Sequence, residues 1–162
     1  MRSRNFRRLL WYILVIAWMG VIFFLSAQEA QTSSDFSGKA ISVFARFFIR
    51  DYDDMPVNDQ VQMINGLQHS ARKFAHVFAY FVLGMLVMGA AFTHKVKLVT
   101  QIAAAFVVSV LYAVSDEIHQ FFVPGRSSEI TDVLIDAAGA AIGIAVITFM
   151  KGIRSKNIEE IA

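Results

Sequence analysis

The chain has 162 residues, of which 56% are hydrophobic and 17% are charged. An ordinary soluble domain is about 45–50% apolar and about 25% charged, so this composition argues against a water-soluble protein. There are no cysteines, which excludes disulfide frameworks, iron–sulfur clusters and thiolate zinc sites. The net charge of +2 is small and the basic residues form no single stripe, so we expect no nucleic-acid partner.

The apolar residues are gathered into four long blocks. These blocks cover residues 9–26, 74–92, 98–115 and 133–150, and Asp136 in the last is the one Asp, Glu, Lys or Arg residue in them. A helix that rises about 1.5 Å per residue needs about 20 residues to cross about 30 Å of hydrocarbon. The sequence therefore predicts an all-α integral membrane bundle of four transmembrane helices in a lipid bilayer, as a single domain over residues 1–162.

The first block follows an arginine-rich start, residues 1–8. A signal peptide also starts with basic residues, but its apolar core is usually about 7–15 residues, and Leu25-Ser26-Ala27 is a poor cleavage site. We expect an uncleaved span, with cleavage as the less favoured alternative.

Lysine and arginine counts predict the orientation, because cationic loops resist translocation. The side of the two termini carries nine of these residues: Arg2, Arg4, Arg7, Arg8, Lys95, Lys97, Lys151, Arg154 and Lys156. The other side carries six: Lys39, Arg46, Arg50, Arg72, Lys73 and Arg126. We expect both termini in the cytoplasm and the loop of residues 27–70 outside.

That loop contains a helical pattern of its own. Apolar side chains recur there at helical spacing: Phe36, Ala40, Ile41, Phe44, Phe47 and Phe48. Such an amphipathic helix lies along the membrane surface, or packs as a lid on the outer ends of the bundle. The acidic turn Asp51–Pro56 is expected to end it. A further short helix, capped by Asn58 or Asp59, is expected to end near Asn65-Gly66.

Ionisable and polar residues gather at the outer ends of the second, third and fourth spans. They are Arg72, Lys73 and His76, then Asp116, Glu117, His119 and Gln120, then Asp132 and Asp136. A charge at the bilayer centre costs about 2.5–3.5 kcal/mol on the insertion scale, so such residues usually face the bundle interior and meet partners. We expect these three groups to form one polar site.

On the second span, Lys73, His76 and Tyr80 share one helix face. Arg72 and Lys73 have the alternative of snorkelling at the membrane border. His76 lies a turn deeper, where the alternative to a functional role is a hydrogen bond to a neighbouring carbonyl.

On the third span, Asp116, His119 and Gln120 share a face. An aspartate beside a histidine orients the imidazole and stabilises its charged form, which suits acid–base chemistry or metal ligation. The alternative is a helix end polar enough to meet water, and Pro124-Gly125 agrees that the helix stops there.

On the fourth span, Asp132, Asp136, Gly139 and Gly143 form one stripe. The glycines permit close helix approach, which would bring the carboxylates within reach of the other spans. Asp132 has the alternative role of a helix N-cap, whereas Asp136 lies about 6 Å further in.

Arg126 lies in the turn between the third and fourth spans. Its planar guanidinium suits a phosphate or carboxylate ligand, or else neutralises Asp116, Glu117 or Asp132. Both uses place Arg126 over the polar site.

Several of these motifs occur together in one family of known proteins. They are Arg72-Lys73-Phe74-Ala75-His76, Ser115-Asp116-Glu117-Ile118-His119-Gln120, Val123-Pro124-Gly125-Arg126 and Asp132-Val133-Leu134-Ile135-Asp136 with Gly139 and Gly143. In their order and spacing the chain resembles the VanZ-like membrane proteins, from Phe24-Leu25-Ser26 through the fourth span, without a counterpart for residues 31–65. The resemblance implies a small multi-span protein of the bacterial cytoplasmic membrane and cell envelope. The family is named for a member linked to resistance to glycopeptide antibiotics such as teicoplanin, and the resemblance supplies no biochemical activity.

Three functions are consistent with these residues. The first is an enzyme that binds the head group of a lipid or cell-wall precursor and moves protons on it. Its catalytic residues would be His76, Asp116, Glu117, His119 and Asp136. Its substrate-binding residues would be Arg72, Lys73, Tyr80, Gln120, Arg126 and Asp132. A divalent metal held by His76, His119 and an aspartate is a weaker hypothesis, so no cofactor is assigned.

The second function is binding of the same amphiphile without a reaction. The third is structural, with buried charges that fix helix packing. The sequence leaves open whether the protein is an enzyme and what its oligomeric state is.

Overall fold

The computed structural model describes residues 2–28, 30–126 and 129–161, with side chains described for residues 5–28, 38–39, 41–126 and 129–153. The helices are α1 (Arg2–Ser26), α2 (Ala30–Phe48), α3 (Val57–Ala91), α4 (Leu98–Phe121) and α5 (Ile130–Ile161), with a 3-10 turn over Tyr52–Asp54. These residues contain no strand. The predicted all-α fold is confirmed.

Four of the helices are long and apolar enough to cross a membrane: Asn5–Ser26 of α1, α3, α4 and Ile130–Ile153 of α5. Large apolar side chains on them point outward, such as Ile16, Val99 and Phe149, which are 68%, 77% and 70% exposed. In water an apolar surface of this extent would be a liability, whereas acyl chains cover it at no cost. The chain is therefore a multi-pass membrane protein, as its composition predicts.

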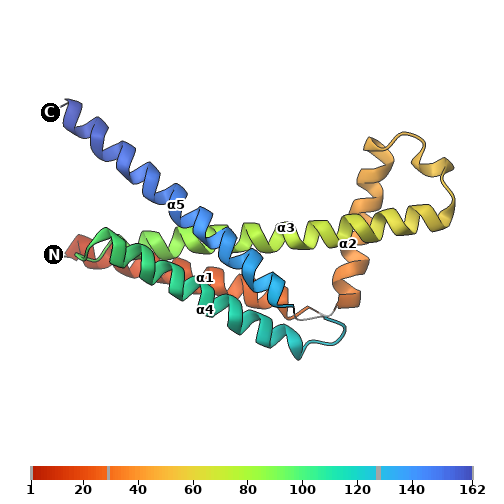
Figure 1. Cartoon of the computed structure of the whole chain (residues 1–162), viewed down its shortest axis with the longest axis horizontal. Coiled ribbons are helices and arrows are strands. Elements are labelled where there is room, and N and C mark those ends of the chain that lie inside the picture. The colour runs from red at the N-terminus through yellow and green to blue at the C-terminus, as the bar shows by residue number, and fades with distance from the viewer. Residues whose placement is uncertain (1, 29, 127–128, 162) are drawn as a thin grey trace.

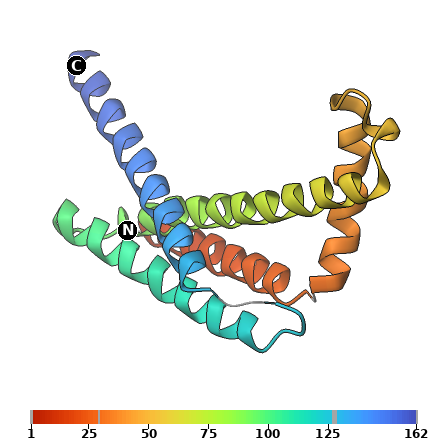
Figure 2. The ribbon, with the colours of Figure 1, turned by 45° about the vertical axis from the view of Figure 1, so that its right-hand side comes forward.

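Helix α3 lies at the centre of the bundle, with α1 and α4 running beside it and α5 crossing it (Figures 1 and 2). The buried core follows from this arrangement, since Tyr80, Leu83 and Met88 of α3 are almost completely buried. The start of α1 and the end of α5 lie toward one end of the bundle (Figure 1). Helix α2 and the turn from α4 to α5 lie toward the opposite end.

The crossing of α3 and α5 depends on glycine. A Cβ atom added at Gly139 would lie 2.4 Å from the carbonyl oxygen of Val77, and one added at Gly143 would lie 2.0 Å from that of Phe81. Gly84 on α3 makes the reciprocal contact, because its added Cβ would lie 2.3 Å from the carbonyl oxygen of Ala140. The two backbones therefore touch, as the glycine stripe of the fourth span predicts.

The segment between α1 and the second span differs from the prediction at two points. The expected cap by Asn58 or Asp59 is wrong, because both residues lie inside α3, whose N-cap is Pro56. The expected break at residues 51–56 is present, because Asp51 adopts a left-handed backbone (φ 61°) and Pro56 directly precedes α3. The expected helix end near Asn65-Gly66 is wrong, because α3 continues through it for 35 residues. A glycine inside a helix costs only about 1 kcal/mol. Packing of α2 offsets that cost here, since a Cβ added at Gly38 would lie 2.6 Å from Nε2 of Gln68.

Helix α2 forms where an amphipathic helix is expected. Its Phe44, Phe47 and Phe48 are 57%, 81% and 72% exposed, while the side chains of Phe36 and Ala40 lie outside the described residues. That this face rests on the membrane surface stays a prediction.

Candidate functional site

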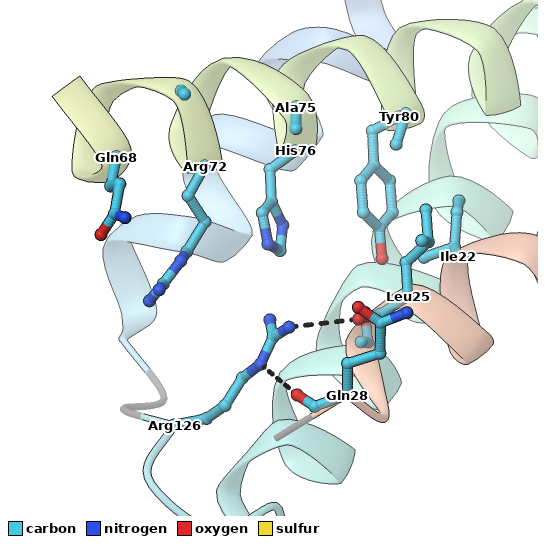
Figure 3. Close-up of a pocket in the computed structure, with 12 residues that line it drawn as sticks. Ile22, Leu25, Gln28, Gln68, Arg72, Ala75, His76, Tyr80 and Arg126 are labelled. Atoms are coloured by element: carbon cyan, nitrogen blue, oxygen red, sulfur yellow. Dashed lines mark hydrogen bonds between the residues drawn. The ribbon is translucent and has the colours of Figure 1, made fainter. Parts of the chain in front are cut away.

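A cavity of about 260 Å³ lies between the last turn of α1 and the middle of α3 (Figure 3). Its apolar lining residues are Ile22, Leu25, Ala71, Ala75 and Ala79. Its polar lining residues are Ser26, Gln28, Gln68, Arg72, His76, Tyr80 and Arg126. The cavity thus combines an aliphatic surface with two guanidinium groups and an imidazole.

A smaller cavity of about 30 Å³ shares Arg72, His76 and Arg126 with the first. Its other lining residues are His69, Lys73, Gln120, Glu129 and Asp132. All six residues predicted to bind substrate, Arg72, Lys73, Tyr80, Gln120, Arg126 and Asp132, line one cavity or the other.

His76 of α3 faces Asp136 of α5. The Nδ1 atom of His76 lies 3.4 Å from Oδ1 of Asp136, and the Asp136 side chain is completely buried. In the described part of the chain, neither carboxylate oxygen of Asp136 has a hydrogen bond, so the histidine is its polar contact. The glycine-mediated approach of α3 and α5 is what brings these two residues together.

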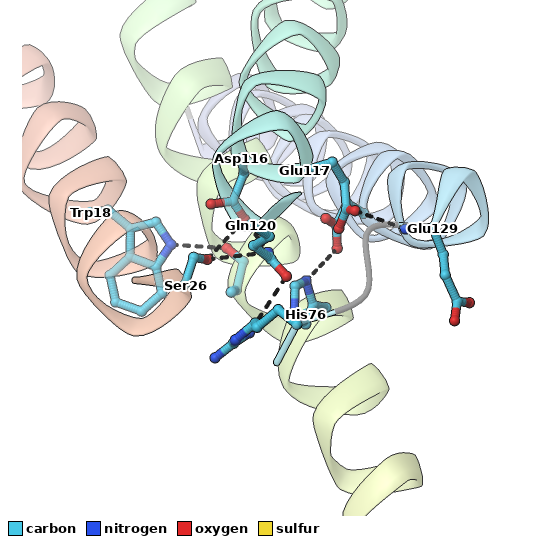
Figure 4. A network of polar contacts seen from close by, with 10 residues as sticks. Trp18, Ser26, His76, Asp116, Glu117, Gln120 and Glu129 are labelled. Atoms are coloured by element: carbon cyan, nitrogen blue, oxygen red, sulfur yellow. Dashed lines mark hydrogen bonds and ion pairs between the residues drawn. The ribbon is translucent and has the colours of Figure 1, made fainter. Parts of the chain in front are cut away.

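Asp116 of α4 is buried beside this pair, with 3% of its surface exposed. Its Oδ2 atom accepts hydrogen bonds from Oγ of Ser26 (3.0 Å) and Nε2 of Gln120 (3.1 Å) (Figure 4). Its Oδ1 atom is buried without a hydrogen bond to any described residue. One ligand atom each from His76, Asp116 and Asp136 lies within 4.8 Å of the others. We call these three residues the buried triad.

Two residues predicted to be catalytic lie apart from the buried triad. The carboxylate of Glu117 is buried and accepts a hydrogen bond from the backbone N–H of Glu129 (3.1 Å) (Figure 4). This bond fixes the residue that directly precedes α5 against α4. The ring of His119 stacks on Phe23 of α1, with 4.4 Å between ring centroids. Asp116 is thus bound by Ser26 and Gln120 rather than by His119.

Arg126 reaches back from the α4–α5 turn to the end of α1. It donates from Nε to the carbonyl oxygen of Gln28 (3.1 Å) and from Nη2 to that of Leu25 (3.1 Å). A cation at a helix C-terminus satisfies carbonyls that have no partner within the helix. Burial lowers the pKa of the Arg126 guanidinium from its ordinary value, and the positive charge of Arg72 lowers it further. An arginine stays protonated in proteins, so Arg126 keeps its positive charge beside the cavity.

Arg72 and Lys73 complete the basic side of the site. Within the described ranges, neither forms a hydrogen bond or an ion pair. Figure 3 shows Arg72 descending from α3 and Arg126 rising from the opposite wall. Asp132 lies in the first turn of α5, which begins at Ile130, rather than at the N-cap position.

A sequence model of the VanZ/LLP1 family matches residues 11–151. The chain belongs to the VanZ/LLP1 family. A search of curated proteins and a search of solved structures each gave no match. The VanZ/LLP1 match covers the buried triad, both cavities and the four candidate spans almost completely.

Two side chains that support the site in this VanZ/LLP1 protein were not among the predicted site residues. Ser26 is buried and binds Asp116, and the indole N–H of Trp18 donates to the carbonyl oxygen of Ala79 (2.9 Å) on the cavity wall. The position of Ser26 at the end of an apolar run is a weak signal, because a serine in a helix often bonds its own backbone. Trp18 carries no signal that distinguishes it from an apolar span residue.

The arrangement supports two kinds of chemistry. The rim, with Arg72 and Arg126, suits an anion such as phosphate or carboxylate. The buried triad, which reaches both cavities through His76, suits a proton or a cation, because two carboxylates meet one imidazole there.

Proposed function

We propose that this VanZ/LLP1 protein binds the anionic head group of a membrane amphiphile, either a lipid or a lipid-linked cell-wall precursor. The single observation that carries the proposal is the cavity in which Arg72 and Arg126 approach from opposite walls above an aliphatic lining. Guanidinium groups recognise phosphate through paired charged hydrogen bonds. The apolar lining would take the first methylene groups of the attached chain.

The size of the cavity fits such a ligand in part. Pockets for drug-sized ligands measure about 300–1,000 Å³, so a cavity of about 260 Å³ holds a head group and the start of a chain. The rest of an acyl or prenyl chain would lie in the bilayer. Lys73, Tyr80, Gln120 and Asp132 would complete the surroundings of the head group.

We place this site in the outer leaflet of the bacterial cytoplasmic membrane, with both termini in the cytoplasm. The support is the excess of lysine and arginine on the side of the termini. A protein that binds a cell-wall precursor there could alter the target of glycopeptide antibiotics such as teicoplanin, which agrees with the resistance that names the family. Catalysis by His76, Asp116, Glu117, His119 and Asp136 stays a prediction.

The first test measures binding of the full-length protein in nanodiscs to a polyprenyl phosphate and to the corresponding polyprenol. We expect the phosphate to bind and the alcohol to bind at least about tenfold more weakly, since a charged hydrogen bond contributes about 1.5–3 kcal/mol. Arg72→Gln should weaken phosphate binding by a similar factor. Arg50→Gln, which removes an exposed arginine outside both cavities, is the matched control. Equal binding of the phosphate and the alcohol would disprove the proposal. Comparing the affinity for phosphatidic acid with that for polyprenyl phosphate distinguishes a membrane lipid from a lipid-linked precursor as the ligand.

A structural role is the second candidate, and the hydrogen bonds of Arg126 favour it. That side chain ties the α4–α5 turn to α1, whereas Arg72 has no bonded partner among the described residues. If the polar residues serve packing alone, Arg126→Gln lowers the amount of folded protein while Arg72→Gln changes neither folding nor phenotype. Loss of ligand binding in folded Arg72→Gln supports the head-group site instead.

A further inference from the structure

The buried triad brings together two acids and one imidazole from three different helices. One ligand atom each of His76, Asp116 and Asp136 lies within 4.8 Å of the others. Asp116 is 3% exposed and Asp136 is 0% exposed. Buried carboxylates in a membrane are costly unless charge nearby compensates them.

The hydrogen bonds in the described part of the chain leave this demand unmet. Oδ1 of Asp116 and Oδ2 of Asp136 are buried without a hydrogen-bond donor. The contact of His76 with Asp136, at 3.4 Å, is longer than the usual 2.7–3.2 Å of an N–H···O hydrogen bond. Even a protonated His76 supplies one positive charge against two carboxylates. A divalent cation would supply two, and it would accept the free oxygen atoms as ligands.

We propose that His76, Asp116 and Asp136 bind one divalent transition-metal cation of the zinc or manganese type. One imidazole nitrogen and two carboxylate oxygens suit these ions, whereas magnesium and calcium prefer oxygen donors alone. Three protein ligands leave an open coordination position. Ligand atoms about 2.0–2.2 Å from zinc lie about 3–4 Å from one another, so rotation of the side chains closes the remaining gap.

The residues around the buried triad hold its members in place. Ser26 and Gln120 fix one oxygen of Asp116 and leave the other free. Gly139 keeps α5 against α3 at Val77, the residue that follows His76. Such supporting contacts orient ligands in known metal sites. His119 is not a ligand in this proposal, because its ring stacks on Phe23.

The proposal does not depend on head-group binding, since the cation would be held in the absence of an amphiphile. The test uses the full chain in detergent or nanodiscs, stripped with a chelator and then titrated with Zn²⁺, Mn²⁺ or Mg²⁺ alone. Isothermal titration and elemental analysis after desalting give affinity and stoichiometry. We expect about one Zn²⁺ or Mn²⁺ per chain, and Mg²⁺ binding at least about tenfold weaker, since Mg²⁺ prefers oxygen ligands and this site offers a nitrogen.

The variants Asp136→Asn and His76→Gln should each weaken binding by about tenfold or more, because each removes a ligand but keeps a polar side chain of similar size. His94→Gln is the matched control, since His94 lies in the α3–α4 turn, lines neither cavity and is no member of the triad. His119→Gln should also keep the metal. Loss of the metal in His119→Gln with retention in His76→Gln would overturn the assignment of ligands.

If a variant does not fold, metal binding to the wild-type protein still tests the proposal. The proposal would be overturned if neither Zn²⁺ nor Mn²⁺ bound the stripped protein at about one ion per chain and neither raised its thermal unfolding midpoint. Binding that is unchanged in a folded Asp116→Asn/Asp136→Asn double variant would overturn it as well. Failure of phosphate binding with a metal still bound would reject the proposed function and leave this site standing.

Discussion

Ser26 connects the first helix to the polar site through a single hydroxyl group. Its Oγ donates to Oδ2 of Asp116 and lies 3.4 Å from Nε2 of Gln120, which donates to the same carboxylate oxygen. In a membrane a buried carboxylate has few other donors to choose from. Ser26 therefore stabilises both the position of Asp116 and the contact between α1 and α4.

Replacing Ser26 with alanine should destabilise the folded protein by about 1–2 kcal/mol, because Asp116 loses the hydrogen bond that the Ser26 hydroxyl donates to its Oδ2 atom. Ser70→Ala is the control, since Ser70 is exposed and its hydroxyl bonds the carbonyl oxygen of Gly66 in its own helix. Unfolding in mixed micelles, followed by circular dichroism, measures both. Equal stabilities of the two variants would contradict the role assigned to Ser26.

The sequence was enough to predict that polar residues of three spans converge on one site. It was not enough to predict which of these residues contact each other. Helical spacing puts His119 and Gln120 both near the face of Asp116. Which of them contacts Asp116 depends on where α1 lies, and the sequence carries no information on that placement. In the structure Ser26 meets the side of Gln120, while Phe23 covers His119.

At the scale of elements, the crossing of α3 and α5 positions the buried triad. Gly139 and Gly143 let α5 touch the α3 backbone at Val77 and Phe81. This contact places Asp136, whose side chain is fully buried, opposite His76, whose side chain is 15% exposed. A wider separation of the helices would remove the His76–Asp136 contact.

Gly143→Ala should destabilise the protein by about 1–3 kcal/mol, because its Cβ would lie 2.0 Å from a backbone oxygen that cannot move without shifting a helix. Gly20→Ala is the control, since nothing lies within 4 Å of its added Cβ. That variant should be neutral or more stable by up to about 1 kcal/mol, given the higher helix propensity of alanine. Thermal unfolding of the two variants tests the difference in sign.

Proline correctly predicted where α3 begins and where α4 has ended, whereas the Asn65-Gly66 pair wrongly predicted a helix end. Pro56 and Pro124-Gly125 fall just outside α3 and α4, where proline's missing N–H and the positive φ of Gly125 (75°) suit a turn. Asn65-Gly66 lies inside α3 because Gly38 of α2 packs closely on Gln68 a few residues further along. Such a tertiary contact overrides a weak local preference.

At the scale of the whole molecule, basic side chains gather at the end of the bundle where α1 starts. Arg8 donates to the carbonyl oxygen of Thr93 (3.2 Å) in the α3–α4 turn, and Nζ of Lys151 lies 3.7 Å from the ring centre of Phe92. Lys95 and Lys97 belong to the same turn. This concentration of positive charge supports the prediction that this end faces the cytoplasm.

The absence of native cysteine makes the orientation directly testable. Asp54→Cys and Lys95→Cys each place one thiol at an exposed position, at opposite ends of the chain's spans. A membrane-impermeant maleimide added to intact cells should label Asp54→Cys and leave Lys95→Cys unlabelled until the cells are permeabilised. The reverse pattern would put the site in the inner leaflet.

The length of helix α3 separates its contact with α2 from the buried triad. Its 35 residues span about 50 Å, whereas the charge-free part from Phe74 onward accounts for about half of that length. The part before Phe74 includes Gln68, on which Gly38 of α2 packs. The position of this contact relative to the buried triad therefore depends on the number of α3 residues between Gln68 and His76. Each residue inserted between these two would shift the contact by about 1.5 Å along α3 and rotate it by about 100° around the axis of α3.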